Sequence, residues 1–105
     1  MLFIETSIFT RRILELLDDE SYRALQEYLM FHPDAGAVIP GSGGLRKLRW
    51  RVPGAGKRGG IRIIYYWVVA KDVILLLFVF RKNERSDLTP EQLRILRQIV
   101  EKDYP

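Results

Sequence analysis

Positively charged side chains crowd into the middle of this 105-residue chain, where their type is suited to binding phosphate groups. Between Asp34 and Asp72 the sequence has eight lysines and arginines and no acidic residue, although the whole chain has a net charge of only +4. Seven of the eight lie in the interval 46–62: Arg46, Lys47, Arg49, Arg51, Lys57, Arg58 and Arg62. Such one-sided charge weakens a fold through self-repulsion and attracts polyanions. The segment therefore predicts a nucleic-acid partner.

Alternation of apolar and basic residues predicts how these cations are displayed. In the strand expected over 45–52, one face carries Leu48, Trp50 and Val52, and the other carries Lys47, Arg49 and Arg51. The strand expected over 61–69 places Arg62 among apolar neighbours, where a charge is costly unless its head group finds a partner. If the two strands form a hairpin, Arg62 joins the cationic face as a phosphate clamp. The alternatives are an ordinary solvated face, and an Arg62 that reaches the sheet edge or pairs with Glu84.

The glycine-rich loop between these strands, residues 53–60, adds Lys57 and Arg58 to the basic segment. A P-loop needs a glycine five residues before its Gly-Lys pair and a serine or threonine after the lysine. Those positions are Arg51 and Arg58, so we reject a nucleoside-triphosphate site here. The loop is either a basic finger over RNA or a long hairpin connection, and the adjoining cationic face favours the finger.

Polar residues after the last expected strand are further candidates for chemistry. Four of them follow the apolar run 73–80 closely: Lys82, Asn83, Glu84 and Arg85. Side chains presented from the end of a rigid strand are well placed for a site, although a charged surface turn is the alternative. Tyr66 shares a face with Arg62 and is the aromatic candidate for stacking on a base, and a place in the core is the alternative for an aromatic residue of this strand.

The absence of cysteine narrows the chemistry further. The sequence has no thiolate nucleophile, and its single histidine, His32, excludes a histidine-based metal cluster, so we expect no metal and no cofactor. His32 lies outside the basic segment and is expected to be structural or exposed. The longest apolar run, 73–80, is too short to span a bilayer, and the N-terminus lacks the pattern of a signal peptide. We therefore expect a cytoplasmic protein with no membrane partner.

The hydrophobic periodicity predicts a single domain over residues 1–105 with α+β architecture. The expected elements are a strand at 2–5, helices capped near Thr6 and Asp18, strands at 45–52, 61–69 and 73–80, and a final helix that begins at Thr89-Pro90. The first two helices form an αα-hairpin in this scheme. The order β-α-α-β-β-β-α predicts helices packed on a small, largely antiparallel sheet.

Three motifs carry a resemblance to a known family. They are Gly43-Gly44-Leu45-Arg46-Lys47, the run from Gly56-Lys57-Arg58 to Tyr66, and Lys82-Asn83-Glu84-Arg85-Ser86-Asp87-Leu88. Together they make the chain resemble, over nearly its whole length, the HigB-type branch of the RelE/ParE toxin superfamily. The resemblance implies a microbial-RNase-like fold and a type II toxin that cleaves mRNA on the ribosome, without a metal, and so inhibits translation. It also implies a helix-turn-helix antitoxin as partner, through which DNA is contacted only indirectly.

The resemblance also implies roles for single residues. Arg62 matches the strand arginine on the scissile phosphate, Lys82 matches a basic residue after the last strand, and Asn83 stands where a second functional arginine occurs. The basic positions expected to hold RNA are Lys47, Lys57 and Arg58. Lys82 is the first candidate for moving the proton and Glu84 the weaker one, because the tyrosine and the C-terminal histidine of some family members are missing here. The alternatives are a ParE-like inhibitor of DNA gyrase and a basic module that binds RNA without cutting it.

Overall fold

The N-terminal strand and helix pair form as their sequence patterns predict. The computed structural model describes residues 1–53, 59–85 and 87–104, and it begins with strand β1, Leu2–Glu5. Helix α1, Ser7–Leu16, is capped by the Thr6 hydroxyl, which accepts a hydrogen bond from the Phe9 N–H at 3.1 Å. Helix α2, Asp19–Phe31, is capped by Asp18 and ends before Pro33, which cannot continue it.

A five-stranded mixed sheet forms the centre of the molecule, with strand order β1-β5-β4-β3-β2. The main antiparallel strands are β3 (Arg46–Trp50), β4 (Ile61–Val68) and β5 (Val73–Arg81), and β1 pairs with β5 in parallel. The predicted α+β class and element order are confirmed. The sequence did not predict β2 (Ala37–Val38), because two residues are too few to show alternation.

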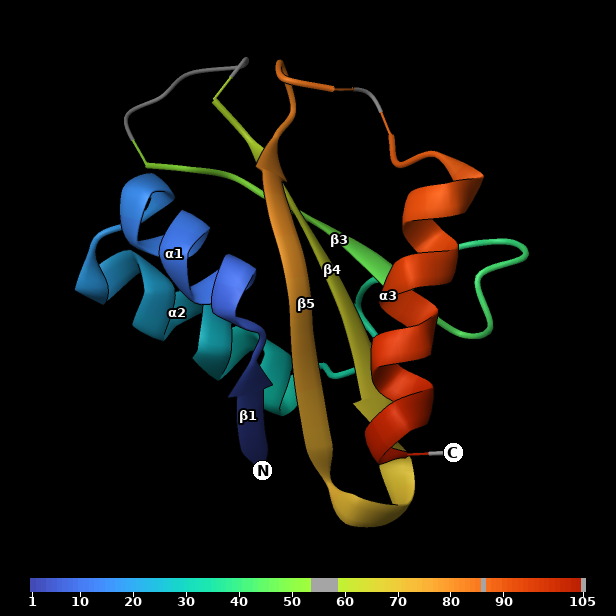
Figure 1. The fold of residues 1–105 in the computed structure, drawn as a ribbon. Coiled ribbons are helices and arrows are strands. Elements are labelled where there is room, and N and C mark those ends of the chain that lie inside the picture. Colours follow the sequence, from blue (N-terminus) through green and yellow to red (C-terminus); the bar gives the residue numbers. More distant parts are fainter. Residues whose placement is uncertain (54–58, 86, 105) are drawn as a thin grey trace.

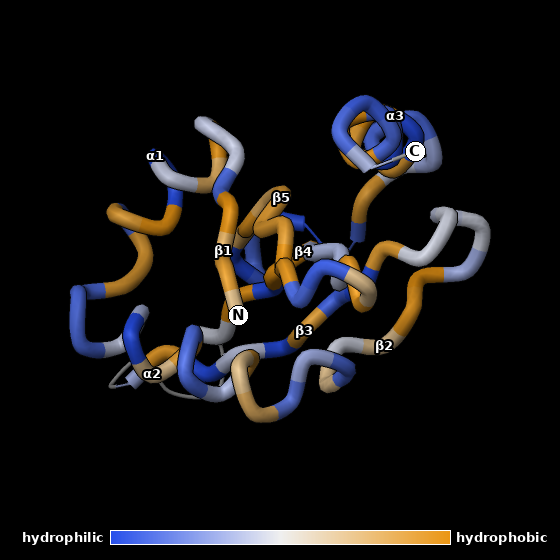
Figure 2. Tube along the Cα trace, turned by 90° about the horizontal axis from the view of Figure 1, so that it is seen from below, coloured by the Kyte–Doolittle hydropathy of each residue, from blue (hydrophilic) through white to orange (hydrophobic). Residues whose placement is uncertain are grey.

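Helices cover both faces of this sheet, as the views in Figures 1 and 2 show. Helices α1 and α2 pack on one face, where Ile63 and Tyr65 of β4 join their core. Helix α3, Pro90–Asp103, packs on the other face against Ile64 and Leu45. Thr89 and Gln92 form the predicted capping box at its start. None of the helices in the described ranges is long and apolar enough to cross a bilayer.

Candidate functional site

Two arginines face each other across the β3–β4 hairpin. Arg49 and Arg62 are Cα partners in the antiparallel register, so their side chains project from the same face of the sheet. This is the face that carries α3, because Phe80, the partner of Arg62 on β5, belongs to the core beneath that helix. Partial burial lowers the pKa of the Arg62 guanidinium, and the positive charge of Arg49 lowers it further. The register therefore confirms the hairpin that was expected to bring these cations together.

Arg62 has no carboxylate partner among the described residues. Its Nη1 donates a hydrogen bond to the carbonyl of its neighbour Ile61 at 3.2 Å. Gly60 lies against the guanidinium, since a Cβ atom built there comes within 3.5 Å of Nη1. Such a guanidinium keeps donors available for an anionic ligand.

Arg85, one of the polar residues expected to follow the last strand, is a third arginine on this face. Its guanidinium carbon lies 5.7 Å from the ring centroid of Phe78 and 5.9 Å from that of Phe80. Phe80 is the cross-strand partner of Arg62, so the chain that leaves β5 turns back over the same region of the sheet. Its position just after a buried strand was the reason to expect Arg85 near a site, but no individual role was assigned to it from the sequence.

Lys47 is also on the cationic face, two residues before Arg49, and it carries the one described acidic contact of this group. Its Nζ lies 3.2 Å from a carboxylate oxygen of Asp87. The Leu88 N–H, which donates to Asp87, lowers the pKa of that carboxyl, and Lys47 lowers it further, against a smaller opposing effect of burial. The ionised Asp87 carboxylate thus pairs with the Lys47 ammonium group in the same way that a phosphate oxygen can.

Lys82 is brought to the same end of the sheet by a backbone contact. Its N–H donates to the carbonyl of Gly60 at 2.9 Å, next to Arg62, and its side chain is exposed. Arg51 is exposed after the end of β3. The expected finger residues Lys57 and Arg58 lie outside the described residues.

Glu84, the weaker candidate for moving the proton, is bound elsewhere. Both of its carboxylate oxygens accept hydrogen bonds from Arg12 of α1 at 2.8 Å, and Arg81 lies 3.6 Å away. Burial raises the pKa of Glu84, but the hydrogen bonds and charges of these two arginines outweigh it, so the pKa is lowered. The structure therefore does not pair Glu84 with Arg62, and an ionised carboxylate held in this way is a poor base. We do not propose it as one.

Of the three other candidates from the sequence, Arg46 and Tyr66 are engaged by residues outside the arginine pair. Arg46 donates to the carbonyls of Asp34 and Gly36, at 3.1 and 2.8 Å. Tyr66 is covered by Arg97 of α3, whose guanidinium carbon is 5.2 Å from the ring centroid, so that face of the ring is occupied. Asn83 lines a groove of about 350 Å³ together with Leu16 of α1 and Gly60, the glycine that lies against Arg62.

Among the described residues, no three His, Asp or Glu side chains gather as the ligands of a metal ion do.

Comparison with known proteins concerns mainly the fold. No family model matches the chain. A mutant of the Escherichia coli toxin RelE, in its free state, matches with a TM-score of 0.60 over 91% of this chain and 95% of that one. The identity is 14%, so the match shows a RelE-like fold.

Proposed function

We propose that this chain is the toxin of a type II toxin–antitoxin module, and that it cleaves mRNA on the ribosome without a metal. The observation that carries the proposal is the pair of like charges at Arg49 and Arg62, which face each other in register. Like charges directly opposite on a sheet destabilise it, and a phosphate group offsets that cost. The RelE-like fold, shared with a protein described as a toxin, supports the same proposal.

The chemistry that suits this face is attack by a 2′-hydroxyl on the adjacent phosphate. The attack forms a phosphorane with an additional negative charge, and the bond to the 5′-oxygen then breaks. Arg62 and Arg49 are positioned to hold that charge with their paired donors, and Arg85 extends the cationic surface from the other side. Fixed donors aimed at developing charge supply much of the catalytic effect in such sites.

Proton transfer is the second requirement, since the attacking 2′-hydroxyl must lose a proton and the departing 5′-oxygen must gain one, and we assign both transfers to Lys82. Its backbone is fixed beside Gly60, which lies against Arg62, and its side chain is exposed at that point. The remaining basic residues are proposed to bind the RNA backbone: Lys47, Arg51, Lys57 and Arg58. In this state Lys47 binds a phosphate in place of Asp87. Correct placement of the 2′-hydroxyl is then left to the ribosome, which makes a sparse site sufficient.

The proposed partners follow from this role. The ribosome and its mRNA are the targets in the cytoplasm, and a helix-turn-helix antitoxin is the proposed neutralising partner, which links the complex to DNA. The HigB-type branch is proposed on the three motifs that resemble it.

Induced expression with mapping of transcript 5′ ends tests the proposal. We expect discrete new ends inside translated reading frames with the wild-type protein, and none with Arg62→Ala at an equal level of folded protein. Loss of DNA supercoiling with intact mRNA indicates a gyrase inhibitor and overturns the proposal. RNA binding that falls steeply with salt, without cleavage or growth arrest, indicates a non-catalytic module and overturns it as well.

A further inference from the structure

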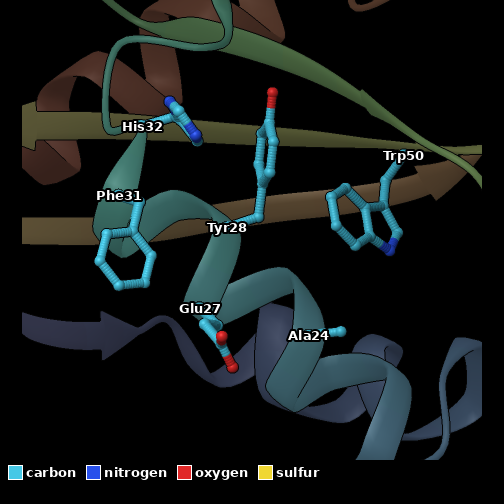
Figure 3. A pocket seen from close by; sticks show the side chains of 6 residues that line it. All are labelled: Ala24, Glu27, Tyr28, Phe31, His32 and Trp50. Atoms are coloured by element: carbon cyan, nitrogen blue, oxygen red, sulfur yellow. The ribbon is translucent and has the colours of Figure 1, made fainter.

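A pocket rich in aromatic side chains lies on the opposite face of the sheet from the arginine pair. Its volume is about 380 Å³, and α2 and its C-cap supply most of the lining: Ala24, Glu27, Tyr28, Phe31, His32 and, from β3, Trp50. Figure 3 shows Tyr28 between the indole of Trp50 and the ring of His32. The ring centroids are 5.4 Å apart for Tyr28 and Trp50, and 4.9 Å apart for Tyr28 and His32. We call this site the aromatic pocket.

The aromatic pocket is open to a ligand because its rings are only partly covered. Phe31 is 71% exposed and Tyr28 is 40% exposed, although both are large and apolar enough to favour burial. Trp50 is anchored on its inner side, where it packs against the core under α1 and α2. Exposed aromatic side chains around a concave surface are typical of a binding site.

The charge of this region is opposite to that of the rest of the chain. Residues 18–34 contain five carboxylates and one arginine, a net charge of −4, so the remaining residues carry +8 within the total of +4. Glu27 brings one of these carboxylates to the pocket lining. The last turn of α2 contains no basic residue, so the partial negative charge of the helix C-terminus is not offset from within the helix.

The neighbouring cations lie outside the lining of the aromatic pocket. Arg23, one turn before Glu27 on α2, lines an adjacent pocket together with Glu27 and Phe31. Arg49 and Arg51 flank Trp50 in sequence, but the alternation of β3 places them on the other face of the sheet. Arg46 shares a face with Trp50, but its guanidinium donates to the carbonyls of Asp34 and Gly36 and it is not part of the pocket lining.

We propose that the aromatic pocket binds the guanidinium group of an arginine in a basic segment of a partner protein. Aromatic faces attract cations, tryptophan most strongly, and a guanidinium stacks on them more readily than an ammonium because it is more weakly hydrated. The Glu27 carboxylate and the end of α2 favour the same charge. RNA fits this face less well, because its phosphates meet the acidic helix, whereas the arginine pair is on the opposite face.

Nuclear magnetic resonance titration with short peptides tests this proposal independently of RNA cleavage. The probes are an acetylated and amidated Gly-Arg-Gly-Arg-Gly peptide and its citrulline counterpart, which keeps the shape but lacks the charge. The signals are the amides of Phe31 and His32 and the indole N–H of Trp50, assigned by comparison with Trp67→Phe. We expect saturable shifts with the arginine peptide, with a dissociation constant of about 1 mM, and no saturation with the citrulline peptide.

Matched variants locate the interaction. Glu27→Gln and Phe31→Ser should each weaken arginine-peptide binding at least about threefold, whereas Leu14→Ser, at a position of α1 that is 70% exposed, should leave it unchanged. Arg62→Ala should also leave it unchanged, which separates this proposal from the proposed cleavage. Equal binding of both peptides, an unaltered affinity in Glu27→Gln, or stronger shifts of Phe31 and His32 with hexauridylate than with the arginine peptide overturns it.

Discussion

Arg49 and Arg62 are in-register partners on β3 and β4, so two guanidinium groups share one face of the sheet at its loop end. The pairing costs stability, because like charges directly opposite repel, and the partial burial of Arg62 increases that cost. The same arrangement provides several donors for one phosphate group. The pair therefore destabilises the fold but favours phosphate binding.

Replacement of Arg49 with glutamine is expected to stabilise the fold and weaken RNA binding. Removal of one member of the pair relieves the repulsion, so the free energy of unfolding should rise by about 0.5 kcal/mol. Affinity for a short RNA should fall by about fivefold to tenfold, since one charge-assisted contact is lost. Urea unfolding and fluorescence anisotropy measure the two effects. Arg11→Gln, at an exposed position of α1, is the control. A clear loss of stability in Arg49→Gln argues against repulsion between Arg49 and Arg62 as a destabilising contribution.

Replacement of Glu84 with glutamine is expected to affect stability in a pH-dependent way and to spare cleavage. The folded protein holds the pKa of Glu84 below its usual value of 4.5, so its ionised form stabilises the fold above that pH. This stabilisation is lost as the pH falls through the lowered value. At pH 7 the variant should therefore be less stable by roughly 0.5–1 kcal/mol, in keeping with a partly exposed ion pair, and the difference should shrink below pH 4.5.

Urea unfolding of both proteins between pH 3 and pH 7 gives this difference directly. An unchanged difference at low pH shows that the ion pair with Arg12 is not its source. Loss of a general base lowers a rate by about 10²–10⁴-fold. A decrease of that size in the cleavage rate of Glu84→Gln contradicts the structural role that we assign to it.

Gly43, in the loop before β3, is expected to be necessary because the Arg97 side chain leaves no room for a Cβ atom there. Gly43 has a φ of +73°, and a Cβ atom there comes within 2.5 Å of the Arg97 Nε. Gly41 has a φ of +71° but nothing within 4 Å, so it is the control for backbone strain alone. Gly43→Ala should cost about 1 kcal/mol more than Gly41→Ala, because Arg97 is pushed away from Tyr66.

A double-mutant cycle isolates this contact. In an Arg97→Ala background the two glycine variants should be equally destabilised, as measured by urea unfolding. A difference that persists without Arg97 means that the extra cost arises elsewhere in the loop.

Much of the scaffold was predictable because its determinants are local. Thr6, Asp18 and Thr89 cap their helices through contacts three residues away in the chain. The alternation along β3 placed Lys47 and Arg49 on one face, and a hairpin with β4 was enough to add Arg62. Two-residue strand β2 left no such local pattern.

The parts of the site that were missed depend on contacts distant in sequence. Glu84 is held by Arg12, which is 72 residues away, and Lys47 meets Asp87, which is 40 residues away. The covering of Tyr66 by Arg97 also joins the sheet to a different element. Alternation along a strand predicts which face of the sheet a side chain is on. It does not predict which distant residue forms hydrogen bonds with that side chain or stacks on its ring.

The most direct test of ribosome-dependent cleavage through Arg62 is a single-turnover assay with the purified protein, an mRNA and programmed ribosomes. We expect cleavage only when ribosomes are present, and a rate at least about 10²-fold lower for Arg62→Ala, since fixed donors to the developing charge contribute on that scale. Arg11→Ala, at an exposed position of α1, should cleave at the wild-type rate. Cleavage by folded Arg62→Ala at the wild-type rate contradicts the catalytic role proposed for Arg62.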